Sequence, residues 1–288
     1  MDEIRIDLPQ VSLSALTWGP ADGPLALLLH GFPDTARTWR HLGPDLAADG
    51  WRVVAPYLRG YAPSDVPADG RGDVAALISD VLGLHAALGG GPDAVLVGHD
   101  WGAITANALA AHEDCPFAKV VTLSVPPFAA LRSPNVARSL PRQLRSSWYI
   151  LFNRLPWLPE RAYARLVRKL WRDWSPGYDA AEDLPAVLAA MAGPENRRTI
   201  IGYYRALLSP FGPPPAYRRW KGAEMRLPLQ PILSLHGDRD GCLDPRLAAL
   251  AEPHLPPGSQ VVLVPEAGHF LQLEQPAAVN HLIRAYLA

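Results

Sequence analysis

The run Gly98-His99-Asp100-Trp101-Gly102 combines residue types and spacing that suit a catalytic nucleophile. An apolar stretch, 94–97, leads into it, and a helical pattern, 103–111, follows it. Glycines two positions before and after Asp100 permit a strained turn that lifts one side chain above a sheet edge. A carboxylate is ionised at neutral pH and needs no base before it attacks a saturated carbon, forming an ester. A helix-capping carboxylate is the structural alternative.

Two later segments contain residue types that could complete a catalytic triad. His269 lies in Gly268-His269-Phe270, after the apolar run 260–264, and would be the base that activates water. The run His236-Gly237-Asp238-Arg239-Asp240 follows the apolar run 231–235 and offers two carboxylates, Asp238 and Asp240, that could orient the histidine. Nucleophile, acid and then histidine is the chain order of α/β-hydrolase triads.

The motif His30-Gly31-Phe32-Pro33 follows another apolar run, 25–29. A loop at this place can direct a backbone N–H at a developing oxyanion, beside the N–H of the residue after the nucleophile. We therefore expect Phe32 and Trp101 to supply an oxyanion hole. A simple strand-to-helix turn is the alternative.

Short apolar runs that alternate with helical patterns must position these residues. The expected strands span 25–29, 51–55, 94–97, 119–123, 231–235 and 260–264, and the clearest helix spans 73–88. This alternation predicts an α/β fold with a mostly parallel, doubly wound sheet, and 4–18 is expected to add antiparallel strands at one edge. No strand pattern occurs between about Pro126 and Pro228. We therefore expect a core domain, 1–125 and 229–288, with an inserted helical cap (lid) domain, 126–228, over the carboxyl ends of the strands.

The bulk composition excludes several functional classes. The chain has 288 residues, 49% of them hydrophobic and 19% charged, and a formal net charge of −1. This overall balance gives no reason to expect binding to nucleic acid or to an acidic membrane surface. No signal peptide, membrane span or metal-ligand spacing is recognised. The two cysteines, Cys115 and Cys242, are expected to be free thiols, which favours a cytoplasmic location.

As a set, the motifs resemble those of the α/β-hydrolase superfamily, in its epoxide hydrolase and haloalkane dehalogenase branch, over essentially the whole chain. His30-Gly31-Phe32-Pro33, Trp39-Arg40 and the run 59–65 (Arg-Gly-Tyr-Ala-Pro-Ser-Asp) are similar to those of epoxide hydrolases, whereas 98–102 is shared with many dehalogenases. The resemblance implies Asp240 as the acid, because Gly-x-x-Asp is the commoner family pattern.

The same resemblance implies two tyrosines in the cap that donate protons to the epoxide oxygen. Tyr149, in 147–152, and Tyr204, which precedes Arg205, match the family pattern, with Tyr203 as the competitor of Tyr204. A phenol stays protonated at neutral pH and can donate. A haloalkane dehalogenase often has Asn directly after the His-Gly pair, where this chain has Phe32. This difference favours the epoxide hydrolase.

The resulting hypothesis is a cofactor-independent epoxide hydrolase that acts through an alkyl ester on Asp100 and releases a vicinal diol. The expected partners are a small-molecule epoxide and water, with no nucleic acid and no metal; a homodimer stays open. A haloalkane dehalogenase with the same nucleophile is one alternative. A non-catalytic ligand-binding relative is another, although such a protein needs neither a complete triad nor proton donors.

Overall fold

The structure is a computed structural model, and it describes residues 1–128, 132, 134–207 and 212–288. An eight-stranded sheet with the order β1-β2-β4-β3-β5-β6-β7-β8 forms the centre of this part of the chain. The strands are β1 (Asp2–Asp7), β2 (Ser12–Trp18), β3 (Leu25–Leu29), β4 (Arg52–Pro56), β5 (Val95–His99), β6 (Lys119–Leu123), β7 (Ile232–Gly237) and β8 (Gln260–Val264). Strands β3 to β8 pair in parallel. The predicted α/β-hydrolase fold with a mostly parallel sheet is confirmed.

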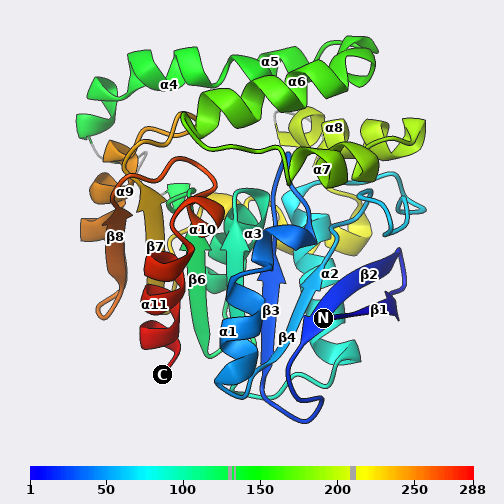
Figure 1. Ribbon diagram of the computed structural model, residues 1–288, viewed down its shortest axis with the longest axis vertical. Helices are drawn as coiled ribbons and strands as arrows, with labels where there is room; N and C mark the ends of the chain where they lie inside the picture. The colour runs from blue at the N-terminus through cyan, green and yellow to red at the C-terminus, as the bar shows by residue number, and fades with distance from the viewer. Residues whose placement is uncertain (129–131, 133, 208–211) are drawn as a thin grey trace.

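The antiparallel strands are confined to one edge, as expected for the first segment. Strand β2 runs antiparallel to both β1 and β4. The central strands β3 and β5 are buried along their whole length, because helices cover both faces of the sheet. Figure 1 shows α1 (Leu42–Ala48) and α11 (Pro276–Leu287) on one face, and α2 (Val74–Ala87) and α3 (Trp101–Ala110) on the other.

The chain between β6 and β7 is helical in its described residues, which contain no strand. Its α-helices are α4 (Leu140–Ser146), α5 (Trp148–Asn153), α6 (Leu158–Trp174), α7 (Leu184–Ala190) and α8 (Pro194–Leu207). Figure 1 shows them together beyond the carboxyl ends of the parallel strands. The division into a core domain, 1–125 and 229–288, and a cap domain, 126–228, stays a prediction.

The remaining helices of the described residues are short. They are α9 (Arg246–Ala251), α10 (Leu271–Glu274) and the short 3-10 helices η1 (Ala36–Trp39), η3 (Pro134–Arg138), η4 (Pro215–Trp220), η5 (Ala223–Met225) and η6 (Glu252–His254). None of the helices in the described ranges is both long and apolar enough to cross a membrane.

Candidate active site

Asp100 lies at the turn between β5 and α3, at the carboxyl edge of the sheet. Its backbone has φ +51° and ψ −111°, a conformation that costs a non-glycine residue free energy. Neighbouring glycines make room for it, since a Cβ at Gly98 would lie 2.3 Å from the carbonyl oxygen of Gly102, and one at Gly31 would lie 2.4 Å from the Cβ of Asp100. Helix α3 begins at Trp101, two residues before the predicted start, because Asp100 alone forms the sharp turn.

The two carboxylate oxygens of Asp100 have different neighbours. The Phe32 amide donates to Oδ1 at 2.8 Å, whereas Oδ2 lies 3.6 Å from Nε2 of His269. Phe32 therefore lies where an oxyanion-hole donor was expected. Among the described residues, no hydrogen bond joins the Trp101 amide to Asp100, although Trp101 directly follows it.

His269 and Asp240 come together from the loops after β8 and β7. Nδ1 of His269 lies 3.0 Å from Oδ2 of Asp240, and both side chains are fully buried. Oδ1 of Asp240 accepts from the amides of Cys242, at 2.7 Å, and Leu243, at 3.1 Å. Asp238 is exposed, so the geometry favours Asp240 as the partner of the histidine.

The charges of this site shift the pKa values of its members. Burial alone would lower the pKa of His269, but the carboxylates of Asp240 and Asp100 outweigh it and raise the pKa to about 10. For Asp240, burial opposes ionisation, but His269 and His236 hold its pKa well below the usual range. His269 is therefore an imidazolium between two carboxylates when the site is empty.

The rings of Tyr149 and Tyr204 pack edge to face, with centroids 5.5 Å apart and an interplanar angle of 87°. Both line a cavity of about 230 Å³ together with Asp100, Trp101 and apolar side chains. Burial raises the pKa of both phenols well above the ordinary value, so both are protonated donors. The Tyr149 hydroxyl lies 3.5 Å from Sγ of Cys242, whereas the Tyr204 hydroxyl has no hydrogen-bond partner among the described residues.

Tyr203, the competitor of Tyr204, has a different partner. Its hydroxyl donates to the backbone carbonyl of Arg59 at 2.8 Å, in the loop after β4. Its ring packs edge-on against Trp101 and Tyr61. Tyr203 therefore joins helix α8 to the sheet layer and does not line the cavity with Asp100.

The site consists of a strained turn at the sheet centre, followed along the chain by an acid and a histidine. Residues 24–276 match the family model described as alpha/beta hydrolase fold, which agrees with this arrangement. The chain belongs to the α/β-hydrolase family.

Named relatives of this α/β hydrolase cover nearly its whole length. The AB hydrolase superfamily protein YfhM of Bacillus subtilis (strain 168) is 31% identical, over 96% of this chain and 94% of the relative. Epoxide hydrolase A of Mycobacterium tuberculosis (strain ATCC 25618 / H37Rv) is also 31% identical, over 99% of this chain and 97% of the relative. The crystal structure of Epoxide Hydrolase A from Mycobacterium thermoresistibile has a TM-score of 0.75 at 26% identity, covering 99% of this chain and 98% of that one.

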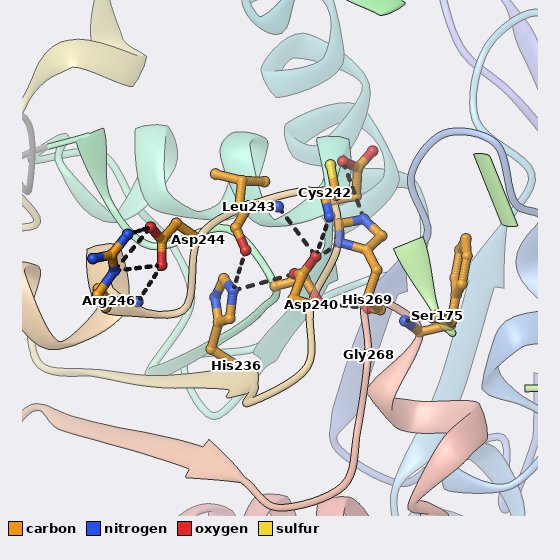
Figure 2. Close-up of polar contacts among 12 residues, drawn as sticks. Ser175, His236, Asp240, Cys242, Leu243, Asp244, Arg246, Gly268 and His269 are labelled. Carbon is orange, nitrogen blue, oxygen red and sulfur yellow. Dashed lines mark hydrogen bonds and ion pairs between the residues drawn. The ribbon is translucent and has the colours of Figure 1, made fainter. Parts of the chain in front are cut away.

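Two residues next to the site of this α/β hydrolase escaped the sequence analysis. His236 is buried at the end of β7, and its Nε2 lies 3.1 Å from the Oδ2 of Asp240 that also contacts His269 (Figure 2). Trp174, the last residue of α6, has its ring 4.8 Å from that of His269 and 4.9 Å from that of Tyr149. The spacing of His236 and Asp240 was a usable signal, whereas nothing local to Trp174 connects it with the loops it contacts.

Within the ranges that the structure describes, no group of three or more His, Cys, Asp or Glu side chains is arranged to hold a metal ion. The buried histidine of the His-Gly motif, His30, is used structurally: its Nε2 accepts from the amide of Leu58 at 3.0 Å. Burial lowers the pKa of His30 to about 4, so it is neutral at pH 7.

Proposed function

We propose that this α/β hydrolase is an epoxide hydrolase, which converts an epoxide and water to a vicinal diol through an alkyl ester on Asp100. The observation that carries the proposal is the pair of buried, protonated phenols, Tyr149 and Tyr204, that line one cavity with the Asp100 carboxylate. Opening an epoxide produces an alkoxide, which needs hydrogen-bond donors of this kind. The names of the relatives from Mycobacterium support the same reaction.

In the first step, the phenols bind the epoxide oxygen and Asp100 attacks a ring carbon. Oδ2 is the attacking oxygen, because Oδ1 is already held by the Phe32 amide. The carbon–oxygen bond of the ring breaks as the new ester bond forms, and a tyrosine proton neutralises the alkoxide. The apolar lining of the cavity suits an uncharged, mainly hydrophobic epoxide.

In the second step, His269 takes a proton from water, which attacks the carbonyl carbon of the ester. Oδ1 becomes the oxyanion, with the Phe32 amide already in place and the Trp101 amide as the second donor. Esterification removes the negative charge of Asp100, one of the two carboxylates that raise the pKa of His269. The first step therefore lowers the pKa of the histidine, whose proton replaces the one given up by the tyrosine, and prepares it to act as the base. When the tetrahedral intermediate collapses, the bond between the carbonyl carbon and the ester oxygen breaks, and the diol oxygen leaves with the proton that His269 took from water.

A single turnover in ¹⁸O-labelled water tests the covalent route. Water attacks the enzyme ester, so the label should enter the Asp100 carboxylate and be absent from the first diol. Replacing His269→Gln should preserve alkylation and let the ester accumulate, which intact-protein mass spectrometry detects as a mass increase equal to that of the epoxide. Label found directly in first-turnover diol would overturn the ester mechanism.

A substrate panel separates the proposal from its alternatives. Diol formation from styrene-type, aliphatic or fatty-acid epoxides is the expected result. Halide release from haloalkanes without diol formation would instead assign the Asp100 nucleophile to a haloalkane dehalogenase. Tight epoxide binding without an adduct on the His269→Gln variant would identify a non-catalytic binding protein.

A further inference from the structure

The helices α4 and α5, with the short segment that follows them, present a row of large apolar side chains to solvent. We define the apolar stripe as Leu140, Leu144, Trp148, Leu151, Leu155 and Trp157. The first four are spaced by three or four residues within the helices, and the last two follow the end of α5 at Asn153. Of the twelve exposed large apolar side chains in the described residues, seven lie between 140 and 158. Leu144 is 72% exposed and Leu151 is 67% exposed, so packing within the chain does not account for them.

Other side chains of the same helices line the active-site cavity. Tyr149 is buried, and Gln143, Ser147 and Ile150 line the cavity with it. Figure 1 shows α4 and α5 at the end of the molecule farthest from the sheet. The apolar stripe therefore forms a second, outward surface that the catalytic site does not use.

Basic side chains surround this surface. Residues 138–172 contain nine Arg and Lys and a single acid, Glu160, so their net charge is 9 − 1 = +8, although the whole chain has a net charge of −1. Glu160 is already paired with Arg205 at 2.6 Å. Arg145 and Arg154 are exposed and, within the described residues, form no ion pair. Residues 138–172 are therefore strongly basic, which the net charge of the whole chain does not reveal.

A surface groove borders the apolar stripe at Trp148, and most of its charged side chains are basic. Arg145, Lys169 and Arg172 line it, with Asp173 as the one acid, paired with both Lys169 and Arg172. The ammonium of Lys169 also lies 5.6 Å from the centre of the Trp148 ring. Arg145 is left to bind an anion at the edge of the apolar surface.

We propose that the apolar stripe and its basic surroundings dock this protein on the surface of an anionic lipid bilayer. Leucine and tryptophan side chains that protrude between arginines are typical of helices that lie in the interface of a membrane. The basic side chains attract anionic headgroups, and the apolar ones enter the acyl boundary. Pairing of two copies through this face is disfavoured, because it would place the exposed Arg145 and Arg154 of one copy, unpaired within the described residues, against those of the other.

Vesicle co-sedimentation of the full chain tests the proposal. The protein should bind vesicles of phosphatidylcholine and phosphatidylglycerol in equal parts, bind pure phosphatidylcholine weakly, and lose affinity as salt is raised. The double variant Leu144→Gln/Leu151→Gln should weaken binding about tenfold or more. Arg145→Gln and Arg154→Gln should each weaken it about fivefold.

The matched control is Leu229→Gln/Leu263→Gln, which changes two similarly exposed leucines outside the helices α4 and α5 and should leave vesicle binding unchanged. Circular dichroism melting checks that every variant is folded. Absence of binding to anionic vesicles, or equal binding to neutral ones, would overturn the proposal. Dimerisation in light scattering that Leu144→Gln/Leu151→Gln abolishes would assign the apolar stripe to a second copy of the chain, and binding only to an acidic protein would assign it to a protein partner.

Discussion

The two phenols of the cavity differ in what their hydroxyls already contact. Tyr149 has the Cys242 thiol at 3.5 Å, whereas the buried hydroxyl of Tyr204 has no partner among the described residues. An unpaired buried hydroxyl is costly, and a bound epoxide oxygen would relieve that cost. Tyr204 is therefore expected to be the stronger contributor to substrate binding and ring opening.

This difference predicts the effect of removing each hydroxyl. Tyr204→Phe should slow alkylation of Asp100 about 10²- to 10³-fold, as expected for a lost oxyanion donor, and Tyr149→Phe should slow it less. Single-turnover kinetics of ester formation on a His269→Gln background measure this step. Tyr203→Phe is the matched control: it loses only the bond to the Arg59 carbonyl, so it should lower the melting temperature and leave alkylation nearly unchanged. A Tyr203→Phe variant that lost alkylation while Tyr204→Phe kept it would reverse the assignment.

The protonation state of His269 makes stability depend on pH in a defined direction. Its pKa is about 10 in the folded protein and about 6.5 in the unfolded chain, so protonation stabilises the folded state fully below about pH 6.5. This contribution is lost as the pH rises towards 10. The melting temperature should therefore fall across this window, and less steeply for Asp100→Asn, which removes one of the two carboxylates that raise the pKa. Equal slopes for both proteins in thermal melts would argue against this charge coupling.

At the scale of elements, the loop after β4 is anchored by a buried ion pair. The Arg59 guanidinium contacts both carboxylate oxygens of Asp80 in α2, at 2.5 and 2.6 Å. The same loop accepts hydrogen bonds from helix α8, through Tyr203 to Arg59 and through Asn196 to Gly60. The ion pair thus holds the loop that helix α8, which contains Tyr204, contacts.

Removing the Asp80 carboxylate should destabilise the folded protein, because the charged Arg59 side chain stays buried without this partner. Asp80→Asn is expected to lower the free energy of unfolding by about 3 kcal/mol in urea denaturation. The control is Asp49→Asn, which breaks the exposed pair with Arg284 and should cost about 1 kcal/mol or less. If the two variants were equally stable, burial of the Arg59–Asp80 pair would have no energetic consequence.

The elements that the sequence predicts well are those set by continuous apolar runs. The strands at 25–29 and 119–123 have the predicted bounds, because buried parallel strands need apolar side chains on both faces. The edge strand at 260–264 also has the predicted bounds, although most of its residues are partly or fully exposed. Strand β5 continues two residues farther, to His99, because its pairing with β6 extends to Leu123. That extension depends on a neighbouring strand that a local pattern does not include.

The site shows the same division between local and long-range information. Asp100 and His269 are identified by motifs that immediately follow apolar runs. The choice between Asp238 and Asp240 depends on burial in the folded turn, and the contact of His236 with Asp240 depends on the path of the chain after β7. Contacts of this kind are set by tertiary packing, so the sequence motifs alone do not predict them.

At the scale of the whole molecule, helix α6 connects the layer above the sheet with the loop that carries His269. The backbone carbonyl of Trp174 accepts from the amides of His269, at 3.1 Å, and Gly241, at 3.0 Å. One turn earlier, the Trp171 ring stacks on Phe270 with centroids 3.9 Å apart, and its Nε1 donates to the Pro33 carbonyl at 2.7 Å. These contacts predict that the helices between β6 and β7 and the sheet layer unfold as one cooperative unit.

Trp171→Ala tests this coupling, because it removes a buried ring that contacts two loops of the site. Truncation should lower the free energy of unfolding by about 3–5 kcal/mol and keep a single transition, with the far-ultraviolet signal and the tryptophan fluorescence changing together. Trp157→Ala, at an exposed position, should change stability little. Because Phe270 adjoins His269, Trp171→Ala should also slow hydrolysis of the ester more than its formation. Two separated transitions, with hydrolysis of the ester unaffected, would show that the helical layer and the catalytic loops are energetically independent.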